Sequence, residues 1–552
     1  MAQITEDKRT PHVIIVGAGL AGISTAIRLK KHLRFENFTI YEKANAIGGT
    51  WRDNTYPGCG SDVPGHWYSL SSELNPQWSS YFVEQPEIRA YWEGLYQKYG
   101  LPLHTKLGHA VVSAEWEPSL QRYNVTVQDL ATGVTKHEVA ECIFYAIGGF
   151  MAPLYPKDIP GVEDFRGELW HSARWRHDVE LKGKRVGVIG NGCSAAQFIP
   201  QISKDPSVEV INFCRTPQWY VPRGNYRYSQ FIKWVFAHVP LVMRFYRNYI
   251  MARSDLSFLI FRRTNARLIA LTKRLLSMYI KQVAPKEYAG DLTPEYPPGC
   301  KRIIVDPGYL ESLNQPNVSL RWEAIDSIVE GGIKLKTGEI IPLDIIIFGT
   351  GYSVEPVDLR VHGSKGTTVH EYFATQGGAT AYLGTCMPGF PNIFTLLGPN
   401  VATGHASVIF SQESQINFAI QLIKPILDGQ AKSFEVADNA TEEYNTWLQG
   451  RLSTSVWTQC NSYYQVGGQK HTKIVATFPG PVSLFWWLTL TPEWGVFRSV
   501  GAERWMKQHR ITKAQEWGIW SVVLGLGLGW GLWFNGQLAE SIKRSLSFNV
   551  AV

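Results

Sequence analysis

Apolar residues first gather in a short run near the start of the chain. Four β-branched residues, 13–16, precede the glycine-rich sequence 17–22, and apolar positions then recur as on one face of a helix. A second apolar run, 38–41, ends at Glu42. The pattern predicts a strand, a glycine turn, a helix and a second strand that ends in a carboxylate. This is the arrangement of a dinucleotide-binding unit.

The glycines of this first unit have separate physical roles. Gly17 allows the tight turn, Gly19 lets the backbone approach a pyrophosphate, and Gly22 lets the helix pack closely on the strand. The helix amino terminus favours an anion, and Glu42 is placed to accept hydrogen bonds from ribose hydroxyls. We therefore expect these four residues to bind a dinucleotide.

The same pattern occurs a second time, beginning at residue 185. The apolar run 185–189 precedes a Gly-Asn-Gly-Cys-Ser-Ala turn, a helical pattern and a further apolar run, 208–213, which Arg215 follows instead of an acid. Because arginine binds a 2′-phosphate that a carboxylate would repel, the second unit is predicted to bind NADPH rather than NADH. The residues expected at this cofactor are Gly190, Asn191, Gly192, Cys193, Ser194, Ala195, Ala196, Arg215 and Thr216.

A long stretch between 226 and 286 departs from both patterns. It is aromatic and basic, Asp255 is its single acid, and its apolar residues recur at helical spacing. The stretch predicts a helical insertion that packs on the core, forms a lid or lies on a membrane. Elsewhere, alternating or continuous apolar runs predict strands at 111–116, 123–127, 143–149 and 340–348.

Near the end of the chain, the 23 residues 517–539 carry no charge. About 20 such residues suffice to cross a bilayer as a helix, and tryptophans near both ends suit the membrane interface. We expect an apolar C-terminal helix that associates with a membrane, with the catalytic domains facing the cytosol. A buried or surface amphipathic tail is the alternative.

The length of the chain, 552 residues, is too great for one hydrophobic core. The predicted fold class is α/β, with two Rossmann-like dinucleotide-binding domains, a helical insertion and an apolar C-terminal helix. The expected division is as follows: 1–150 and 341–505 for the first unit, 151–225 and 299–340 for the second, 226–298 for the insertion and 506–552 for the tail.

Charge and cysteine content exclude several classes. The net charge of +7 is modest, and no nucleic-acid-binding module is present in the sequence. The seven cysteines are widely spaced without a Cys-x-x-Cys pair, so we predict no metal site and no redox dithiol. The first ten residues are polar and lack an apolar signal region. The simplest expectation is that all the thiols are reduced, in a cytosolic environment.

The stretch 48–62 is rich in glycine and aromatic residues. Its sequence, Gly-Gly-Thr-Trp-Arg-Asp-Asn-Thr-Tyr-Pro-Gly-Cys-Gly-Ser-Asp, resembles the first fingerprint of the Baeyer–Villiger monooxygenases, a group of class B flavoprotein monooxygenases. That pattern is a small residue, Gly-x-Trp, four residues, Tyr or Phe, Pro, Gly or Met, three residues and Asp. Every slot is filled, by Gly48, Gly49, Trp51, Tyr56, Pro57, Gly58 and Asp62.

The segment 165–175 resembles the second fingerprint of the same family, Phe-x-Gly-x-x-x-His-x-x-x-Trp followed by Pro or Asp. Phe165, Gly167, His171 and Trp175 match it, whereas Arg176 departs from the last position. Related enzymes that oxygenate nitrogen or sulfur typically carry Phe or Tyr in place of Trp175. For His171 we expect either a structural role or a functional one. The resemblance places it at the linker between the domains, which favours domain coupling over a direct chemical role.

The resemblance implies FAD in the first unit and NADPH in the second. It makes Arg302 the cation beside the flavin, and Asp62 is its natural partner because a buried arginine needs a counter-charge. Arg302 and Asp62 are thus the predicted catalytic residues. Further FAD contacts are expected from Gly49, Thr50, Trp51, Arg52, Asp53, Asp62, Tyr68 and Val111, and further NADP contacts from Gly60, Ser61 and Asp62.

The activity implied is insertion of one oxygen atom from O2 beside a ketone carbonyl, at the expense of NADPH, to give an ester or lactone. The substrate is expected to be lipophilic and to belong to a secondary metabolism similar to that of fungi. The alternatives are oxygenation of nitrogen or sulfur, a membrane-bound NAD(P)H–quinone oxidoreductase, and a flavin-binding protein without turnover. A fixed cation stabilises the negative charge that develops during oxygen transfer, so Arg302 favours an oxygenase.

Overall fold

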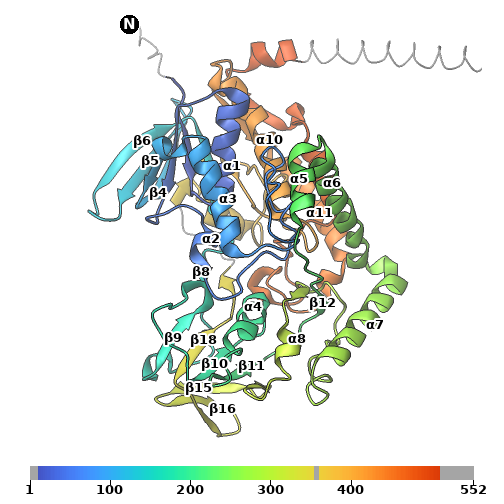
Figure 1. Ribbon diagram of the computed structural model, residues 1–552. Coiled ribbons are helices and arrows are strands. Elements are labelled where there is room, and N and C mark those ends of the chain that lie inside the picture. Colours follow the sequence, from blue (N-terminus) through green and yellow to red (C-terminus); the bar gives the residue numbers. More distant parts are fainter. Residues whose placement is uncertain (1–9, 354–359, 510–552) are drawn as a thin grey trace, which may run out of the picture.

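The computed structural model describes residues 10–353 and 360–509. Two five-stranded parallel sheets organise these residues. Figure 1 shows the first sheet with its helices in the upper half of the molecule, the second sheet in the lower half, and three helices along one edge. The α/β fold with two Rossmann-like sheets is confirmed.

The first sheet contains the amino-terminal dinucleotide-binding unit. Its strands, in spatial order, are β21 (Ile393–Thr395), β7 (Cys142–Tyr145), β1 (Val13–Val16), β2 (Phe38–Glu42) and β3 (Thr105–Leu107). Helix α1 (Leu20–Arg28) follows β1 and packs against α3 (Gln85–Lys98) and α10 (Val408–Leu427). Because helices cover the sheet, β1 is buried along its whole length, which explains its continuous apolar sequence.

The second sheet repeats this arrangement. Its strands, in spatial order, are β14 (Val318–Arg321), β11 (Glu209–Phe213), β10 (Arg185–Ile189), β18 (Ile345–Phe348) and β9 (Glu168–His171). Helix α4 (Cys193–Ile202) follows β10 and packs against α8 (Tyr309–Ser312).

The strand predicted at 340–348 is wrong in one respect, because the chain turns a corner inside it. β17 (Ile340–Pro342) pairs antiparallel with β16 (Gly332–Leu335), whereas β18 pairs parallel with β10. The corner is held by Asp344, whose carboxylate accepts a hydrogen bond from the Arg185 N–H at 2.8 Å. The expected division at 340 is also wrong, since β18 belongs to the second sheet.

Smaller groups of strands, most of them paired antiparallel, flank both sheets. The predicted meander is present as β4 (His109–Glu117), β5 (Arg122–Asp129) and β6 (Thr135–Ala140), with β20 (Arg360–His362) beside β4. β15 (Ile325–Val329) completes the sheet of β16 and β17. Three strand pairs remain: β8 (Ala152–Pro153) with β19 (Tyr352–Ser353), β12 (Tyr220–Pro222) with β13 (Ile304–Asp306), and β22 (Ser433–Val436) with β23 (Phe497–Val500).

The predicted insertion is helical. It contains α5 (Gln230–His238), α6 (Val242–Leu256) and α7 (Ala266–Val283). The remaining α-helices of the described chain are α2 (Thr50–Asp53), α9 (Val369–Thr375), α11 (Asp438–Ser453) and α12 (Val482–Thr489). Buried Arg247 anchors α6 to the core, because it donates to the Ser69 carbonyl at 3.3 Å and lies 3.6 Å from the Glu413 carboxylate.

The expected apolar C-terminal helix, 517–539, lies outside the described residues. Within 10–353 and 360–509, every helix is too short or too polar to serve as a transmembrane span.

Candidate active site

The first glycine turn forms a cradle at the amino end of α1. Gly17 has a φ of +105°, and a Cβ there would lie 2.8 Å from the Ala146 carbonyl oxygen. A Cβ on Gly22 would lie 1.9 Å from the Gly17 carbonyl oxygen. Helix α1 begins after Gly19 without a side-chain cap, so its first N–H groups face outward as anion donors. The turn therefore fits a pyrophosphate.

Glu42 lies buried at the end of β2. Its Oε2 accepts the Ala18 N–H at 2.8 Å, and its Oε1 accepts the Ala44 N–H and Arg52 Nη1, each at 3.0 Å. A carboxylate offers about four acceptor positions, so these bonds leave room for a ribose hydroxyl.

The glycine- and aromatic-rich stretch closes over this cradle. A Cβ on Gly49 would lie 3.1 Å from the Gly19 Cα, so the two backbones meet with little space between them. Thr50 begins the short helix α2, and the buried Trp51 packs edge-on against Tyr68 at 5.6 Å between ring centroids. Arg52 donates to both carboxylate oxygens of Asp53, at 2.7 and 3.1 Å.

The same stretch also contacts the second unit through Gln197 of α4. The Tyr56 hydroxyl donates to Gln197 Oε1 at 2.9 Å, and Gln197 Nε2 donates to the Gly60 carbonyl at 3.0 Å. A Cβ on Gly58 would lie 2.7 Å from the Gln197 carbonyl oxygen. The Ser61 N–H donates a hydrogen bond to the Val83 carbonyl at 3.0 Å. The stretch thus joins the two glycine turns.

Arg302 and Asp62 meet between the two units, as the sequence predicts. Arg302 Nε and Nη2 donate to Asp62 Oδ2 at 3.0 and 2.6 Å, and Nη1 lies 3.5 Å from the Gly404 carbonyl. The Asp62 carboxylate raises the pKa of Arg302 above its ordinary value. The guanidinium is therefore a fixed, permanent cation.

Three further side chains surround this ion pair. Burial raises the pKa of Cys193 to about 11, with the Asp62 charge adding to the rise and the Arg302 charge opposing it. Burial also raises the pKa of Tyr464, against the opposing charge of Arg302. The ring of Tyr463 packs against that of Tyr464 in a tilted arrangement, with 4.6 Å between the ring centroids. Cys193 belongs to the second glycine-rich turn, whereas Tyr463 and Tyr464 lie in a part of the chain without a recognisable sequence pattern.

The second glycine turn repeats the first at the amino end of α4. Gly190 has a φ of +106°, and α4 begins after Gly192 without a side-chain cap. The next positions, Cys193, Ser194, Ala195 and Ala196, form the first turn of α4. Asn191 Nδ2 donates to the Thr216 carbonyl at 3.0 Å, which ties this turn to the segment after β11.

Arg215 extends into solvent beyond the second turn. Its side chain is 90% exposed, and its Nη1 lies 3.9 Å from the Asp158 carboxylate. Burial lowers the pKa of Lys301, and the charge of the nearby Arg215 adds to this lowering. Sequence reasoning assigned no role to Lys301, and its position beside Arg302 was the one available signal. The two cations define a region that suits a phosphate.

The second fingerprint lies beside α4 and the connection between the sheets. Trp175 packs against Phe198 of α4 at 5.2 Å between ring centroids. His171 is fully buried, and its Nδ1 accepts the Ala173 N–H at 3.1 Å. Its burial lowers its pKa to about 4. Its ring is 6.0 Å from that of Tyr352, whose hydroxyl bonds Asn54 after α2.

Arg176, the departure from the second fingerprint, lies on the surface. It donates to the Asp178 carboxylate at 2.8 and 2.6 Å and to Glu168 at 3.2 Å. The unusual residue is therefore used in an ion-pair cluster and does not alter the surroundings of Arg302.

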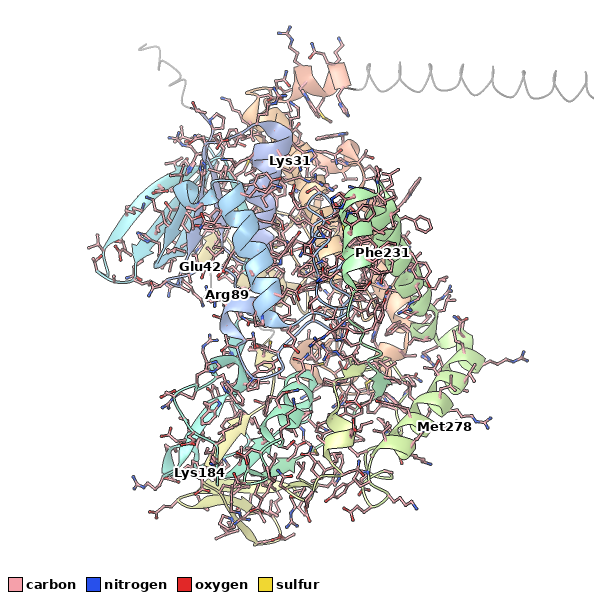
Figure 2. All side chains as sticks on the ribbon, viewed as in Figure 1. Lys31, Glu42, Arg89, Lys184, Phe231 and Met278 are labelled. Carbon is pink, nitrogen blue, oxygen red and sulfur yellow. A yellow bond between two sulfur atoms is a disulfide. The ribbon has the colours of Figure 1, made fainter. Side chains whose placement is uncertain are left out.

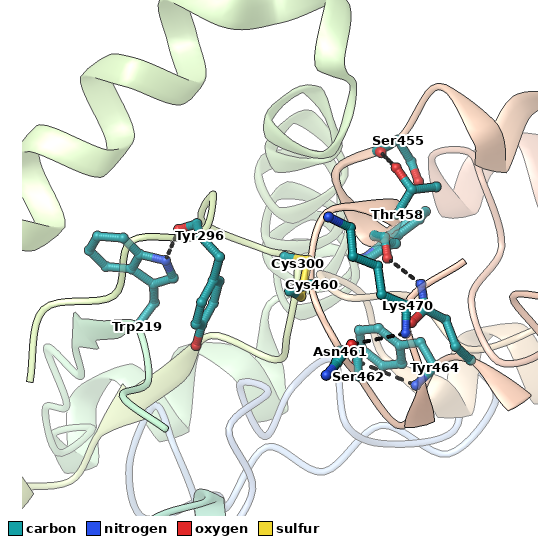
Figure 3. The surroundings of a disulfide bond; sticks show 12 residues. Trp219, Tyr296, Cys300, Ser455, Thr458, Cys460, Asn461, Ser462, Tyr464 and Lys470 are labelled. Atoms are coloured by element: carbon teal, nitrogen blue, oxygen red, sulfur yellow. Dashed lines mark hydrogen bonds between the residues drawn. A yellow bond between two sulfur atoms is a disulfide. The ribbon is translucent and has the colours of Figure 1, made fainter. Parts of the chain in front are cut away.

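The expectation that all cysteines are reduced is wrong, because Cys300 and Cys460 form a disulfide. Figure 3 shows that it joins the segment of Tyr296 to the loop that carries Tyr464. The cysteines are 160 residues apart, so their spacing gave no hint of the pairing, but the fold brings their Cα atoms to 6.1 Å. Since Arg302 follows Cys300 by two residues, the bond ties the arginine segment to its aromatic neighbours.

The insertion reaches the same place through Phe261. A Cβ on Gly299 would lie 2.7 Å from this ring, and a Cβ on Gly404 would lie 2.8 Å from it. Phe261 therefore fills the space between the segment before Arg302 and the loop whose carbonyl faces Arg302. Beside it, His405 Nε2 lies 3.2 Å from the Asp255 carboxylate. Val111, a predicted FAD contact, lies buried in β4.

Two glycine cradles that converge on one fixed cation define an oxidoreductase with two dinucleotide cofactors. Family models agree: one for NAD(P)-binding Rossmann-like domains matches residues 15–84, and one for L-lysine 6-monooxygenase/L-ornithine 5-monooxygenase matches 98–257.

Curated proteins and solved structures place the chain more closely. It is 37% identical over 459 residues to a Baeyer–Villiger monooxygenase of Pseudomonas aeruginosa, covering 82% of this chain and 85% of that one. It is 34% identical to the FAD-binding monooxygenase BOA2 of Botryotinia fuckeliana, covering 82% and 88%. A structure of cyclohexanone monooxygenase from Rhodococcus sp. Phi1 bound to NADP+ is 25% identical, with a TM-score of 0.77 and coverage of 89% and 99%.

The chain therefore belongs to the Baeyer–Villiger monooxygenase family of FAD-binding monooxygenases. This family assignment confirms the predicted oxidoreductase class and the predicted cofactors, FAD and NADPH.

Proposed function

We propose that this protein inserts one oxygen atom from O2 beside the carbonyl of a bulky, lipophilic ketone and so forms an ester or lactone. The observation that carries the proposal is the Arg302–Asp62 ion pair, which lies between the two glycine turns. Arg302 Nη2 and Asp62 Oδ2 are 2.6 Å apart. When bound, FAD supplies the redox chemistry and the activation of oxygen, and NADPH supplies the electrons.

The residues of the chain bind, position and stabilise. The uncapped turns at Gly19 and Gly192 bind the pyrophosphates, and Glu42 orients a ribose. Arg302 stabilises the negative charge that develops on oxygen as it adds to the carbonyl. Asp62 fixes the direction of the guanidinium, and the buried side chains of Tyr464 and Phe261 limit the access of water on the side of the insertion.

A product assay tests the proposed reaction. The purified protein is given NADPH, isotopically labelled O2 and a panel of bulky ketones, and the products are analysed by mass spectrometry. We expect an ester or lactone that contains one labelled oxygen atom. Reduction of a quinone without incorporation of labelled oxygen would contradict the proposal.

A second candidate is oxygenation of nitrogen or sulfur. It is favoured by the match of residues 98–257 to a model of amine-oxygenating enzymes, L-lysine 6-monooxygenase/L-ornithine 5-monooxygenase. Trp175 and the complete first fingerprint favour the ketone reaction instead. Including an amine and a sulfide in the same panel separates the candidates, since each gives a different labelled product. The natural substrate is proposed to come from secondary metabolism.

The preference for NADPH is expected to rest on Arg215. In Arg215→Ala, the loss of a charged hydrogen bond to the 2′-phosphate should raise the KM for NADPH by about 10- to 100-fold. The KM for NADH should change little. Steady-state oxidation of both cofactors measures the two values. Lys301→Ala should shift the ratio in the same direction, whereas Arg166→Ala, an exposed surface change, should leave it unaltered. Equal effects of Arg215→Ala on both cofactors would contradict the assignment.

A further inference from the structure

One exposed face of α7 is apolar along the whole helix. Leu268, Leu271, Leu275 and Met278 are between 37% and 56% exposed. Their spacing of three, four and three residues places them on one side of the helix, away from the buried Leu276 and Ile280. The helix is thus in contact with the protein on one side and presents a second apolar side to solvent.

The neighbouring helices extend this apolar surface. α5 and α6 lie along the same edge of the molecule as α7 (Figure 1). Figure 2 labels Phe231 and Met278 at two places on this edge. Large apolar side chains that are more than half exposed on α5 and α6, or in the turn between them, are Phe231, Trp234, Leu241, Phe245, Tyr249 and Leu256. Exposed apolar side chains that gather on neighbouring helices in this way indicate an interaction site.

The charge of this surface is positive. On α7 the cations Arg267, Arg274 and Lys281 recur every seven residues and so form a row along one edge of the apolar stripe. Asp255, the single acid between 226 and 286, is turned inward, where it accepts hydrogen bonds from the Val482 and Ser483 N–H groups and lies near His405. The next acids in the chain follow the end of α7.

We propose that this face of α5, α6 and α7 docks on an anionic phospholipid bilayer. Leucine, phenylalanine and tryptophan side chains enter the boundary between head groups and acyl chains, while the row of cations on α7 binds lipid phosphates and carboxylates. A second copy of the chain fits this face poorly, because an isologous interface would oppose one cationic row to another. The proposal goes beyond the oxygenation reaction and does not depend on it. It also differs from anchoring by the segment 517–539.

Vesicle flotation with the full-length flavoprotein tests the proposal. The vesicles consist of phosphatidylcholine alone or of phosphatidylcholine with phosphatidylserine. We expect binding to the anionic vesicles that weakens at high salt. The double variant Leu271→Asp/Leu275→Asp should bind at least about tenfold more weakly, since two apolar contacts are lost and two like charges face the lipid. Arg267→Gln/Arg274→Gln should lose the preference for anionic vesicles, even if the aspartate variant proves difficult to fold.

The control variant is Leu103→Asp/Val134→Asp, which alters residues that are 89% and 64% exposed but lie outside the insertion. It should bind vesicles as the unaltered protein does. NADPH oxidation and flavin content should be the same in all variants, which shows that they are folded. Three outcomes would overturn the proposal: equal binding by the α7 variants and the unaltered protein, no preference for anionic lipid, and a dimer in light scattering that the α7 variant loses.

Discussion

Arg302→Ala is expected to abolish product formation while NADPH continues to be oxidised. The guanidinium is the cation that the structure fixes between the two cradles, and its bond to Asp62 keeps it charged and oriented. Loss of one such preorganised donor costs about 10²- to 10³-fold in turnover. The proposed NADPH site, formed by Arg215 and the second glycine turn, is unchanged in this variant. Reducing equivalents should therefore appear as hydrogen peroxide instead of oxygenated product. Parallel assays of NADPH, peroxide and product measure this uncoupling.

Two further variants define the role of Arg302. Arg302→Lys keeps the charge but loses the paired contact with Asp62, and it should recover only part of the product. Arg176→Ala removes an arginine from the surface ion-pair cluster and should leave the ratio of product to NADPH unchanged. Full product formation by Arg302→Ala would show that another group stabilises the developing charge.

The two dinucleotide-binding units could be predicted because their turns impose strict local requirements. At Gly17 and Gly190 the backbone has a positive φ, and an added Cβ would meet a carbonyl oxygen of a neighbouring strand end. Such positions select glycine whatever surrounds them. The partnership of Arg302 and Asp62 could be predicted because a partly buried guanidinium needs a carboxylate and the family resemblance supplied one.

What the sequence could not show are contacts between distant segments. The Cys300–Cys460 disulfide joins residues 160 positions apart, and nothing in the local sequence of either cysteine differs from that of a free thiol. Phe261 fits between Gly299 and Gly404 only because the insertion folds back on the core. The corner at Asp344 was missed because its flanking residues are apolar and resemble one continuous strand.

Gly22→Ala should disrupt the first unit, although alanine is accepted at the matching position of many dinucleotide-binding turns. The second unit itself carries Ala195 there. In the first unit, however, a Cβ would lie 1.9 Å from the Gly17 carbonyl oxygen and 3.3 Å from the Ile15 side chain. Both α1 and the turn would have to move, at a cost of about 1–3 kcal/mol or more for overpacking.

Because the proposed pyrophosphate site consists of that turn and the first N–H groups of α1, the same movement should weaken FAD binding in Gly22→Ala by at least about tenfold. Flavin absorbance after gel filtration and the apparent Tm measure the two effects. Gly94→Ala is the matched control, since the added methyl group in α3 meets nothing within 4 Å and should raise stability slightly. If Gly22→Ala retained FAD and had the same Tm as Gly94→Ala, the prediction would be wrong. The close contact between α1 and the turn would then not be required for FAD binding.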